Sequence, residues 1–326
     1  MTTRPVLALL LAAFVAAASV AAAEPAAADL TAPTTLVTFP WGEGPGELRF
    51  APASGPGEGL PTSFLMDRAG RVHVLDAAAH RIVRGSDGAG VKPPPLDLLP
   101  SGLVKPNSVL IDFDLAPDGS YVVLDETAGT LVRVRPDGKG LGRFGVLRNG
   151  RQLACARDGR VLVSDTGLPA VDLFDAAGKF LGERRGTLFS VYCDGKDRIY
   201  GQQLTGPRRA ALLRTVSAES SRMSVLATVA PDAPDHELAE PRVIGLDDAG
   251  RVYLEVIEVK DGHWLYVRLM RFTTDGAPAG ELRVAPCQEE FTSPPRYWRP
   301  TPDGHILAYR THTAAGYTLV QYRFPN

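Results

Sequence analysis

Hydrophobic and polar positions alternate in a unit that recurs about six times along the chain. Each copy has an apolar stretch, a tight turn and an alternating segment such as the one from Val72 to Leu75. Alternation with a period of two is typical of a half-buried strand, and a turn glycine, often after Asp, fits the left-handed backbone of a hairpin. The aligned turn residues are Gly70, Gly119, Gly159, Asp197, Gly250 and Gly304. Each copy therefore predicts a β-hairpin.

A second turn follows the first at a nearly constant distance, which predicts four short strands per copy. These second turns are Asp87-Gly88, Asp137-Gly138, Ala177-Gly178 and, after a longer excursion, Asp275-Gly276. Four-stranded repeats of roughly forty to fifty residues are the signature of a β-propeller. The alternative, a β-sandwich, needs no fixed repeat.

The two ends of the chain predict how the ring closes. The last copy stops after LAYR and TLVQYRF, one strand short, while Thr35 to Phe39 form an extra strand before the first copy. Pairing this strand into the last blade removes two exposed sheet edges. We therefore predict an all-β fold, a six-bladed β-propeller whose last blade is closed by the N-terminal strand.

Two segments resemble a known repeat family. LPTSFLMDRAGRVHVLDAAAHRIV is similar to an NHL repeat, and GEGPGELRF resembles the loop that leads into one; the first three copies match better than the last three. The resemblance implies a six-bladed propeller of a kind that includes binding scaffolds, and similar propellers include lactonases and a zinc-dependent amidating lyase. Because one fold hosts many chemistries, it implies the fold and not an activity.

The N-terminus predicts export. Residues 1–23 place Arg4 before an apolar run that ends in small residues, as in a secretory signal peptide. The alternative is an uncleaved membrane anchor, for which this alanine-rich run has marginal length. We predict a secreted or periplasmic protein, without stable membrane insertion after cleavage, in which residues 24–33 are a flexible leader and residues 34–326 one propeller domain.

The charge balance excludes some partners. The chain has 35 Lys and Arg against 37 Asp and Glu, a formal charge of -2, which becomes -3 when residues 1–23 and their single cation are removed. A nearly neutral surface has no general attraction for nucleic acid or anionic membranes. We expect no nucleic-acid partner.

The three cysteines are an odd number for an exported protein, so at least one is free or pairs between chains. Cys155 and Cys193 occupy the same repeat position in adjacent blades, so one side chain should point toward its neighbour and the other away. We expect two buried thiols that act as small apolar residues, with a disulfide as the alternative. Cys287 lies in a predicted loop and is a candidate reactive thiol.

Catalytic motifs are absent from the sequence. It has no G-x-S-x-G, no H-E-x-x-H, no paired C-x-x-C and no G-x-x-x-x-G-K. Their absence favours a binding protein, although a site assembled from several blades would need none of them.

Arginine recurs at one ring position, eight residues before the turn residue and near the start of each innermost strand. The six residues there are Thr62, Ile111, Arg151, Phe189, Arg242 and Arg296. Guanidinium groups at a channel mouth can hold a carboxylate, sulfate or phosphate in bidentate fashion. In the alternative interpretation, these arginines pair with carboxylates and tie blades together; the candidates are Glu240, Asp235, Asp112 and Asp114.

Histidines and aromatic residues gather on the same predicted face. The loops that enter each blade and those that join its second and third strands share this face, and they carry His80, His236, His263 and His312. His80 fits a structural role, and His73 should be a strand surface residue. Aromatic rings beside cations suit an anionic or sugar-like ligand. The predicted ligand-binding residues are Arg151, Arg242, Arg296, His263, His312, Tyr297 and Trp298.

Carboxylates in register suggest a metal site only superficially. Asp76, Asp125 and Asp165 each end a strand, where an Asp accepts hydrogen bonds from the following turn, and we favour that role. The lactonase resemblance implies Glu, Asn and Asp in the channel, and Asn107 and Asn149 lie in loops entering blades. We predict no cofactor and assign no metal ligand, with calcium and zinc as alternatives.

Three functions follow. The leading hypothesis is a binding or scaffold module for an anionic small molecule, a glycan or a protein or peptide partner at the channel mouth. The alternative is a metal-assisted, lactonase-like hydrolase or a lyase at the same mouth. A purely structural scaffold, with the mouth plugged by its own side chains, is the third.

Overall fold

The computed structural model describes residues 30–49, 61–85, 93–165, 169–186, 188–286 and 296–325, with the side chains of 310–313 left out. The predicted signal peptide and Cys287 lie outside the described residues. None of the helices in these ranges is both long enough and apolar enough to cross a membrane.

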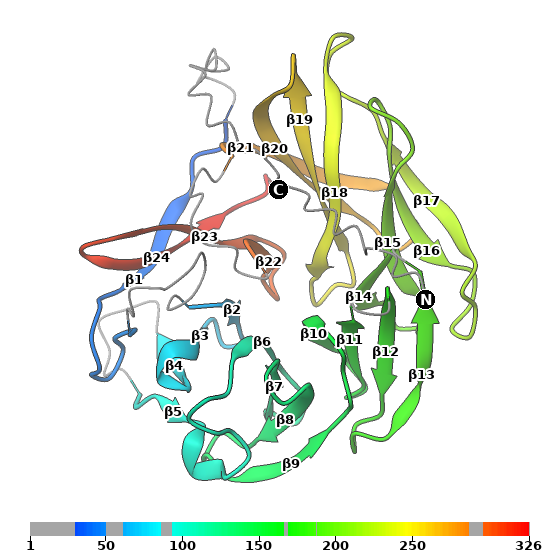
Figure 1. Cartoon of the computed structure of the whole chain (residues 1–326). Helices are drawn as coiled ribbons and strands as arrows, with labels where there is room; N and C mark the ends of the chain where they lie inside the picture. The colour runs from blue at the N-terminus through cyan, green and yellow to red at the C-terminus, as the bar shows by residue number, and fades with distance from the viewer. Residues whose placement is uncertain are drawn as a thin grey trace, which may run out of the picture.

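Six four-stranded antiparallel sheets are arranged as blades around a central axis (Figure 1). Blade 1 comprises β2 (Ser63–Met66), β3 (Val72–Asp76), β4 (Arg81–Gly85) and β5 (Leu96–Asp97). Blade 2 comprises β6 (Leu110–Leu115), β7 (Tyr121–Asp125), β8 (Thr130–Val134) and β9 (Gly140–Phe144). Blade 3 comprises β10 (Gly150–Cys155), β11 (Val161–Asp165), β12 (Ala170–Phe174) and β13 (Phe180–Arg185).

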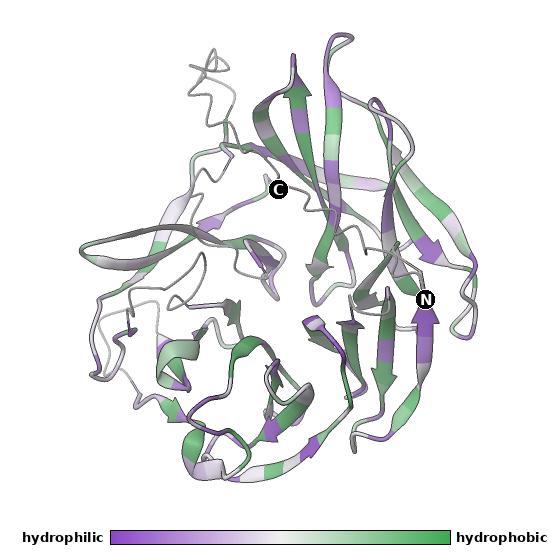
Figure 2. Ribbon diagram, in the orientation of Figure 1, coloured by the Kyte–Doolittle hydropathy of each residue, from purple (hydrophilic) through white to green (hydrophobic). Residues whose placement is uncertain are grey.

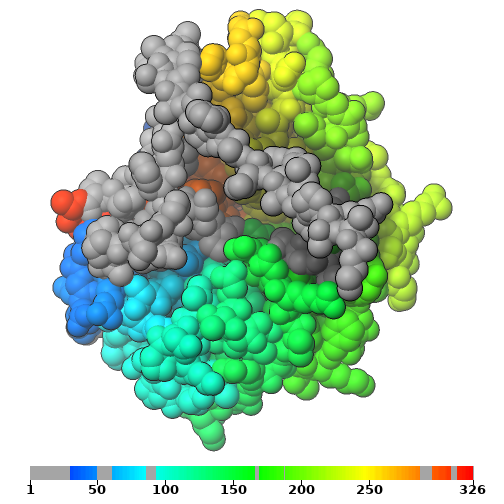
Figure 3. Space-filling view, in the orientation of Figure 1, coloured from blue at the N-terminus to red at the C-terminus, as the bar shows by residue number. Residues whose placement is uncertain are grey.

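The second half of the ring repeats this order. Blade 4 comprises β14 (Phe189–Cys193), β15 (Ile199–Leu204), β16 (Ala210–Thr215) and β17 (Met223–Val229). Blade 5 comprises β18 (Glu237–Leu246), β19 (Val252–Lys260), β20 (His263–Phe272) and β21 (Pro278–Val284). The helical segments of the described residues are two short 3-10 turns, Ala77–Ala79 and Leu99–Ser101. The space-filling view shows the blades following one another around the ring in chain order (Figure 3).

Blade 6 joins the two ends of the chain, as predicted. It contains β22 (Trp298–Pro300), β23 (Ile306–Thr313), β24 (Gly316–Tyr322) and β1 (Thr34–Phe39), with β1 outermost. The β1 strand is antiparallel to β24, from Thr34 opposite Gln321 to Phe39 opposite Tyr317. The chain is a six-bladed β-propeller, and its N-terminal strand closes the ring.

The core lies between neighbouring blades. One cluster joins Tyr253 and Leu269 of blade 5 to Trp298 and Tyr322 of blade 6, and all four side chains are buried. Hydrophobic residues accordingly run along the inner and middle strands (Figure 2). Because each blade is covered on both faces, residues of both alternating sets are buried on its middle strands.

The tight turns after the first strands all lie on one face. Gly70, Gly119 and Gly159 have φ values of 77°, 80° and 89°, and the degenerate copy places Asp197 in the same left-handed region at 64°. Residues from these turns in all six blades border one cavity. We call this side the turn face, and we call the opposite side, where the chain enters each blade, the loop face.

Candidate functional site

A buried ion pair occupies the middle of the channel. Arg296, just before β22, reaches Asp112 on β6, with Nη2 2.8 Å from Oδ2 and Nε 3.1 Å from both carboxylate oxygens. Arg296 is 3% exposed and Asp112 is fully buried. Arg296 also donates to the Tyr192 hydroxyl and the Leu153 carbonyl. Burial opposes ionisation of Arg296, but the charge of Asp112 outweighs it and raises the pKa of the guanidinium.

A second pair spans the channel beside the first. Arg299 on β22 donates from Nη2 to Oδ1 of Asp114 at 2.5 Å, and from Nη1 to the carbonyls of Phe64 and Phe113 at 3.4 and 3.2 Å. The backbone N–H of Cys155 donates to the other Asp114 oxygen at 2.9 Å. Blade 6 is thus tied to blade 2 across blade 1. The pairing interpretation of the arginines is confirmed for Arg296, whose partner is Asp112.

The other two arginines of the predicted ring position are not buried. Arg242 on β18 has two long ion pairs, 3.8 Å to Glu240 and 3.9 Å to Glu255. Arg151 on β10 lies 3.4 Å from Glu126 and is about half exposed. The three arginines therefore have different environments, and their joint role in ligand binding stays a prediction.

Four of the predicted residues do meet around a small recess toward the loop face. Arg242, Arg296, Tyr297 and Trp298 border a hollow of about 10 Å³ together with Glu255 of β19, a residue that the sequence analysis missed. Trp298 Nε1 donates to Glu255 Oε1 at 3.0 Å. Among the described residues, Glu255 Oε2 has no hydrogen-bond partner, and burial to 7% exposure raises the pKa of this carboxyl. The recess has room for about one water molecule.

Of the two histidines predicted to bind ligand, His263 lies away from both hollows of the described structure. His263 begins β20 and is exposed at the end of the β19–β20 hairpin, and His312 lies on β23 opposite Tyr317. His80 Nε2 lies 2.9 Å from the carbonyl of Ser108, which fits the structural role expected for it. His263 borders neither the recess nor the cavity described below. Their role in binding stays a prediction.

The prediction that His73 is a surface residue is wrong. It is 2% exposed because all five residues of β3 are buried between neighbouring blades. Its Nε2 is 3.1 Å from Asp67 Oδ2, and its Nδ1 is 3.1 Å from the Tyr121 hydroxyl. Although burial acts in the opposite direction, hydrogen bonds from His73 and Arg71 hold the pKa of Asp67 well below its usual range.

The registered carboxylates accept hydrogen bonds from backbone N–H groups, and for Asp125 the donor lies in the turn after its strand, as expected. Asp125 Oδ1 accepts from the N–H of Ala128 in the following turn at 3.0 Å. Asp165 accepts from Asn149 N–H, in the loop entering its blade, at 3.1 Å. Asp76 Oδ2 accepts from Arg49 N–H at 3.0 Å. Across the described ranges, the structure has no group of three or more His, Cys, Asp or Glu side chains arranged to hold a metal ion.

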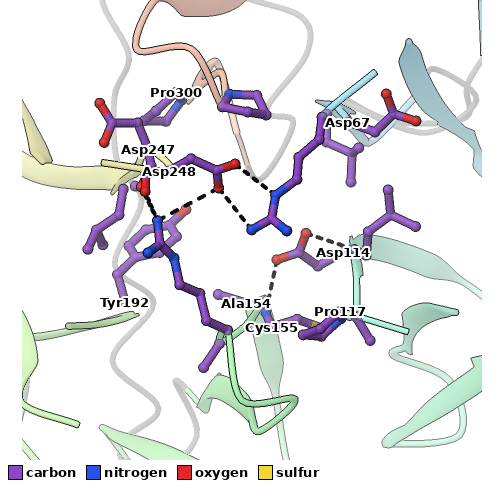
Figure 4. Close-up of a pocket in the computed structure, with 18 of the residues that line it drawn as sticks. Asp67, Asp114, Pro117, Ala154, Cys155, Tyr192, Asp247, Asp248 and Pro300 are labelled. Carbon is purple, nitrogen blue, oxygen red and sulfur yellow. Dashed lines mark hydrogen bonds and ion pairs between the residues drawn. The ribbon is translucent and has the colours of Figure 1, made fainter. Parts of the chain in front are cut away.

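The large cavity opens on the turn face. Its volume is about 730 Å³, and it is bordered by the ends of the innermost strands and by the first turn of each blade. Asp114, Cys155 and Tyr192 line it (Figure 4), and so does Arg299, the partner of Asp114 in the channel. Apolar residues from blades 1, 3, 4 and 5 also line it: Leu65, Ala154, Val191 and Ile244.

An ion-pair bridge crosses the mouth of this cavity (Figure 4). Arg68 of blade 1 donates to Asp248 of blade 5 from Nε at 2.7 Å and from Nη2 at 3.2 Å. Arg157 of blade 3 approaches the same carboxylate at 3.8 Å and donates to the Asp247 carbonyl at 3.3 Å. The side chains of Arg68, Arg157 and Asp248 are 71%, 60% and 43% exposed. The hydrogen bond to Asp248 raises the pKa of Arg68.

These three residues share one repeat position, two before the turn residue. In chain order that position holds Arg68, Pro117, Arg157, Gly195, Asp248 and Pro302. Charged residues therefore alternate with Pro or Gly around the ring. The sequence carried this signal, but at a position next to the turn rather than at the start of the strand.

The two described cysteines also border the cavity as free thiols. Cys193 packs with Leu162 and Ile199 between blades 3 and 4, whereas Cys155 packs with the cluster between blades 2 and 3. One thiol therefore points toward its neighbour and the other away, as predicted. Burial raises the pKa of Cys193 to about 12 and that of Cys155 well above its usual value.

The comparisons with known proteins support the fold alone. No protein-family model matches the chain, and no curated protein matches it in sequence, so the NHL resemblance stays a prediction. The chain is similar to hydrazine synthase from Kuenenia stuttgartiensis, with 11% identity over 80% of this chain and 75% of that one and a TM-score of 0.53.

Two more distant similarities involve different activities. A gluconolactonase from Xanthomonas campestris has 13% identity over 89% of this chain and 98% of its own, with a TM-score of 0.49. Virginiamycin B lyase from Staphylococcus aureus has 12% identity over 81% of this chain and 94% of its own, with a TM-score of 0.46. Identities this low give no information about shared chemistry.

Proposed function

We propose that the chain is a binding module that takes an anionic small molecule into the turn-face cavity. The observation that carries this proposal is a cavity of about 730 Å³ with two exposed arginines, Arg68 and Arg157, at its mouth. Its volume is within the usual range of small-molecule sites. Guanidinium groups bind carboxylates and other oxyanions through paired N–H donors.

The turn face suits this role better than the loop face. The recess near Arg242 has about 10 Å³, too little for more than a water molecule. Arg296, the most buried of the three arginines at the predicted ring position, already donates to Asp112, Tyr192 and a carbonyl. The cavity, by contrast, combines ligand-sized space with exposed donors.

Blocking the cavity tests the proposal. Ala156, half-buried in the first turn of blade 3, borders the cavity, so Ala156→Trp should fill part of it. We expect isothermal titration with acetate, succinate and citrate to detect binding to the parent protein and at least a tenfold loss in Ala156→Trp, because a bulky ring removes ligand space. Gln152→Trp, which enlarges a side chain at the loop-face recess, is the control. Equal affinities for the parent protein and Ala156→Trp would place the site elsewhere.

A second candidate is a hydrolase or lyase that uses the same cavity. His73 and Tyr121 border it, and the imidazole accepts a hydrogen bond from the Tyr121 hydroxyl while donating to Asp67. Such a chain can move a proton to or from the phenol. In blade 5, Tyr253 and Asp247 occupy the repeat positions of His73 and Asp67 and are hydrogen-bonded at 2.7 Å, which favours a structural role for the His73–Asp67 pair.

Turnover separates the two candidates. An enzyme would hydrolyse p-nitrophenyl acetate or a γ-lactone, and Tyr121→Phe would remove that activity while leaving ligand binding intact. Metal analysis of protein purified without chelators tests the metal-assisted form with calcium or zinc.

We propose a secreted or periplasmic location on the basis of residues 1–23.

A further inference from the structure

We infer that Asp248 is an internal ligand: its carboxylate occupies the subsite in which Arg68 and Arg157 bind a carboxylate of the cavity's ligand. This inference rests on the proposed function and specifies its ligand class. It also assigns Asp248 a regulatory role, because the ligand must displace it.

The geometry of the bridge is that of a bound carboxylate. Both oxygens of Asp248 accept from Arg68, at 2.7 and 3.2 Å, and Arg157 lies 3.8 Å from one of them. The two guanidinium groups come from blades 1 and 3, and the carboxylate comes from blade 5. The clamp is therefore built from three separate blades at the mouth of the cavity (Figure 4).

The backbone beneath Asp248 is fixed, whereas its side chain is exposed. Asp248 N–H donates to the Pro302 carbonyl at 3.2 Å. The preceding Asp247 is buried and accepts from Arg251 Nε at 2.6 Å and from the Tyr253 hydroxyl at 2.7 Å. Rotation of the Asp248 side chain alone would therefore free Arg68 and remove the carboxylate from Arg157 without unfolding the turn, while Arg157 keeps its hydrogen bonds to the backbone carbonyls of Asp247 and Asp248.

Exposure makes this displacement easy. Ion pairs between exposed side chains contribute little to stability, since water competes for both partners. A ligand that supplies one carboxylate to the clamp and fills the cavity gains contacts that Asp248 cannot make. The buried Arg296–Asp112 pair has no such freedom, because neither side chain reaches solvent.

The ligand class follows from the chemistry of the internal ligand, the carboxylate of Asp248. A planar carboxylate matches the two parallel donors of Arg68, and the alternation of charge at this repeat position places a second guanidinium two blades away. The site is therefore specific for carboxylates, and phosphate and sulfate serve as competing probes.

Removing the charge of Asp248 tests the inference. Asp248→Asn keeps the shape of the side chain but cannot act as an anion, so citrate should bind about fivefold more tightly to this variant than to the parent protein. Arg68→Ala should weaken citrate binding. Asp303→Asn is the matched control, because Asp303 is an exposed turn-face carboxylate that does not border the cavity. Isothermal titration measures all four proteins.

A second readout separates this inference from the proposed function. Cys193 borders the cavity, so its rate of modification by a bulky methanethiosulfonate, followed by peptide mass spectrometry, reports access through the mouth. Asp248→Asn should react severalfold faster. Equal citrate affinities for the parent protein and Asp248→Asn would overturn the internal ligand while leaving the binding function intact, and tighter binding of phosphate or sulfate than of citrate would overturn the carboxylate assignment. If no carboxylate binds either protein, the proposed function fails. Faster Cys193 modification in Asp248→Asn would then still support the claim that Asp248 closes the mouth of the cavity. An unchanged modification rate would overturn that claim.

Discussion

The middle of the channel and its turn-face mouth use the same pair of residue types in opposite ways. Arg296 and Asp112 are buried and saturated with protein partners, whereas Arg68 and Asp248 are exposed and bridge a cavity. Both pairs connect blades that are not neighbours. The difference teaches that solvent exposure, rather than recurrence of arginine in a repeat, distinguishes a structural brace from a binding group.

The largest expected effect is at the brace. Arg296→Ala leaves the buried Asp112 without its counterion, so we expect the free energy of unfolding to fall by about 3 to 5 kcal/mol. Urea denaturation measures this loss. Arg242→Ala changes the same repeat position in blade 5, where the side chain is partly exposed. The free energy of unfolding of this variant should lie within about 0.5 kcal/mol of that of the parent protein. Similar losses in both variants would break the contrast between buried and exposed arginines.

The fold was predictable because its signals are local. The left-handed turns at Gly70, Gly119 and Gly159 are encoded by single residues, and the closing strand follows from counting strands in the last copy. The partner of Arg296 was among the candidates, but 184 residues separate it from Asp112, and only the closed ring selects that pairing.

The site was less predictable because it depends on how six turns meet. The register position of Arg68, Arg157 and Asp248 is visible in the sequence, yet nothing local indicates that these residues touch across the ring or that a cavity lies behind them. His73 was misplaced for a related reason, since alternation indicates one exposed face and the neighbouring blades cover both.

A smaller effect is expected at Glu255, near the loop face. Glu255→Gln keeps the oxygen that accepts from Trp298 and removes a buried charge, so it should raise the free energy of unfolding by about 1 kcal/mol at pH 8. Because burial raises the pKa of Glu255 in the folded state, the parent protein loses stability as pH rises from the unfolded pKa through the folded one. The gain of the variant should therefore vanish at low pH in urea titrations. A loss of stability at pH 8 would show that the charge of Glu255 is needed by Arg242.

The smallest effect is expected at the turn-face mouth. Arg68→Ala removes an exposed ion pair, so the free energy of unfolding should change by less than about 0.5 kcal/mol. Thermal and urea denaturation check this. A loss comparable to that of Arg296→Ala would mean that the bridge is a brace, and would remove the reason to consider Asp248 displaceable.

The most direct test of the account is citrate titration of two single variants, Arg157→Ala and Arg242→Ala, alongside the parent protein. If the ligand site is the turn-face cavity, Arg157→Ala should bind citrate at least about tenfold more weakly, as expected for a lost charge-assisted contact, while Arg242→Ala binds like the parent protein. Loss of binding in Arg242→Ala with unchanged affinity in Arg157→Ala would contradict the account and return the site to the loop face.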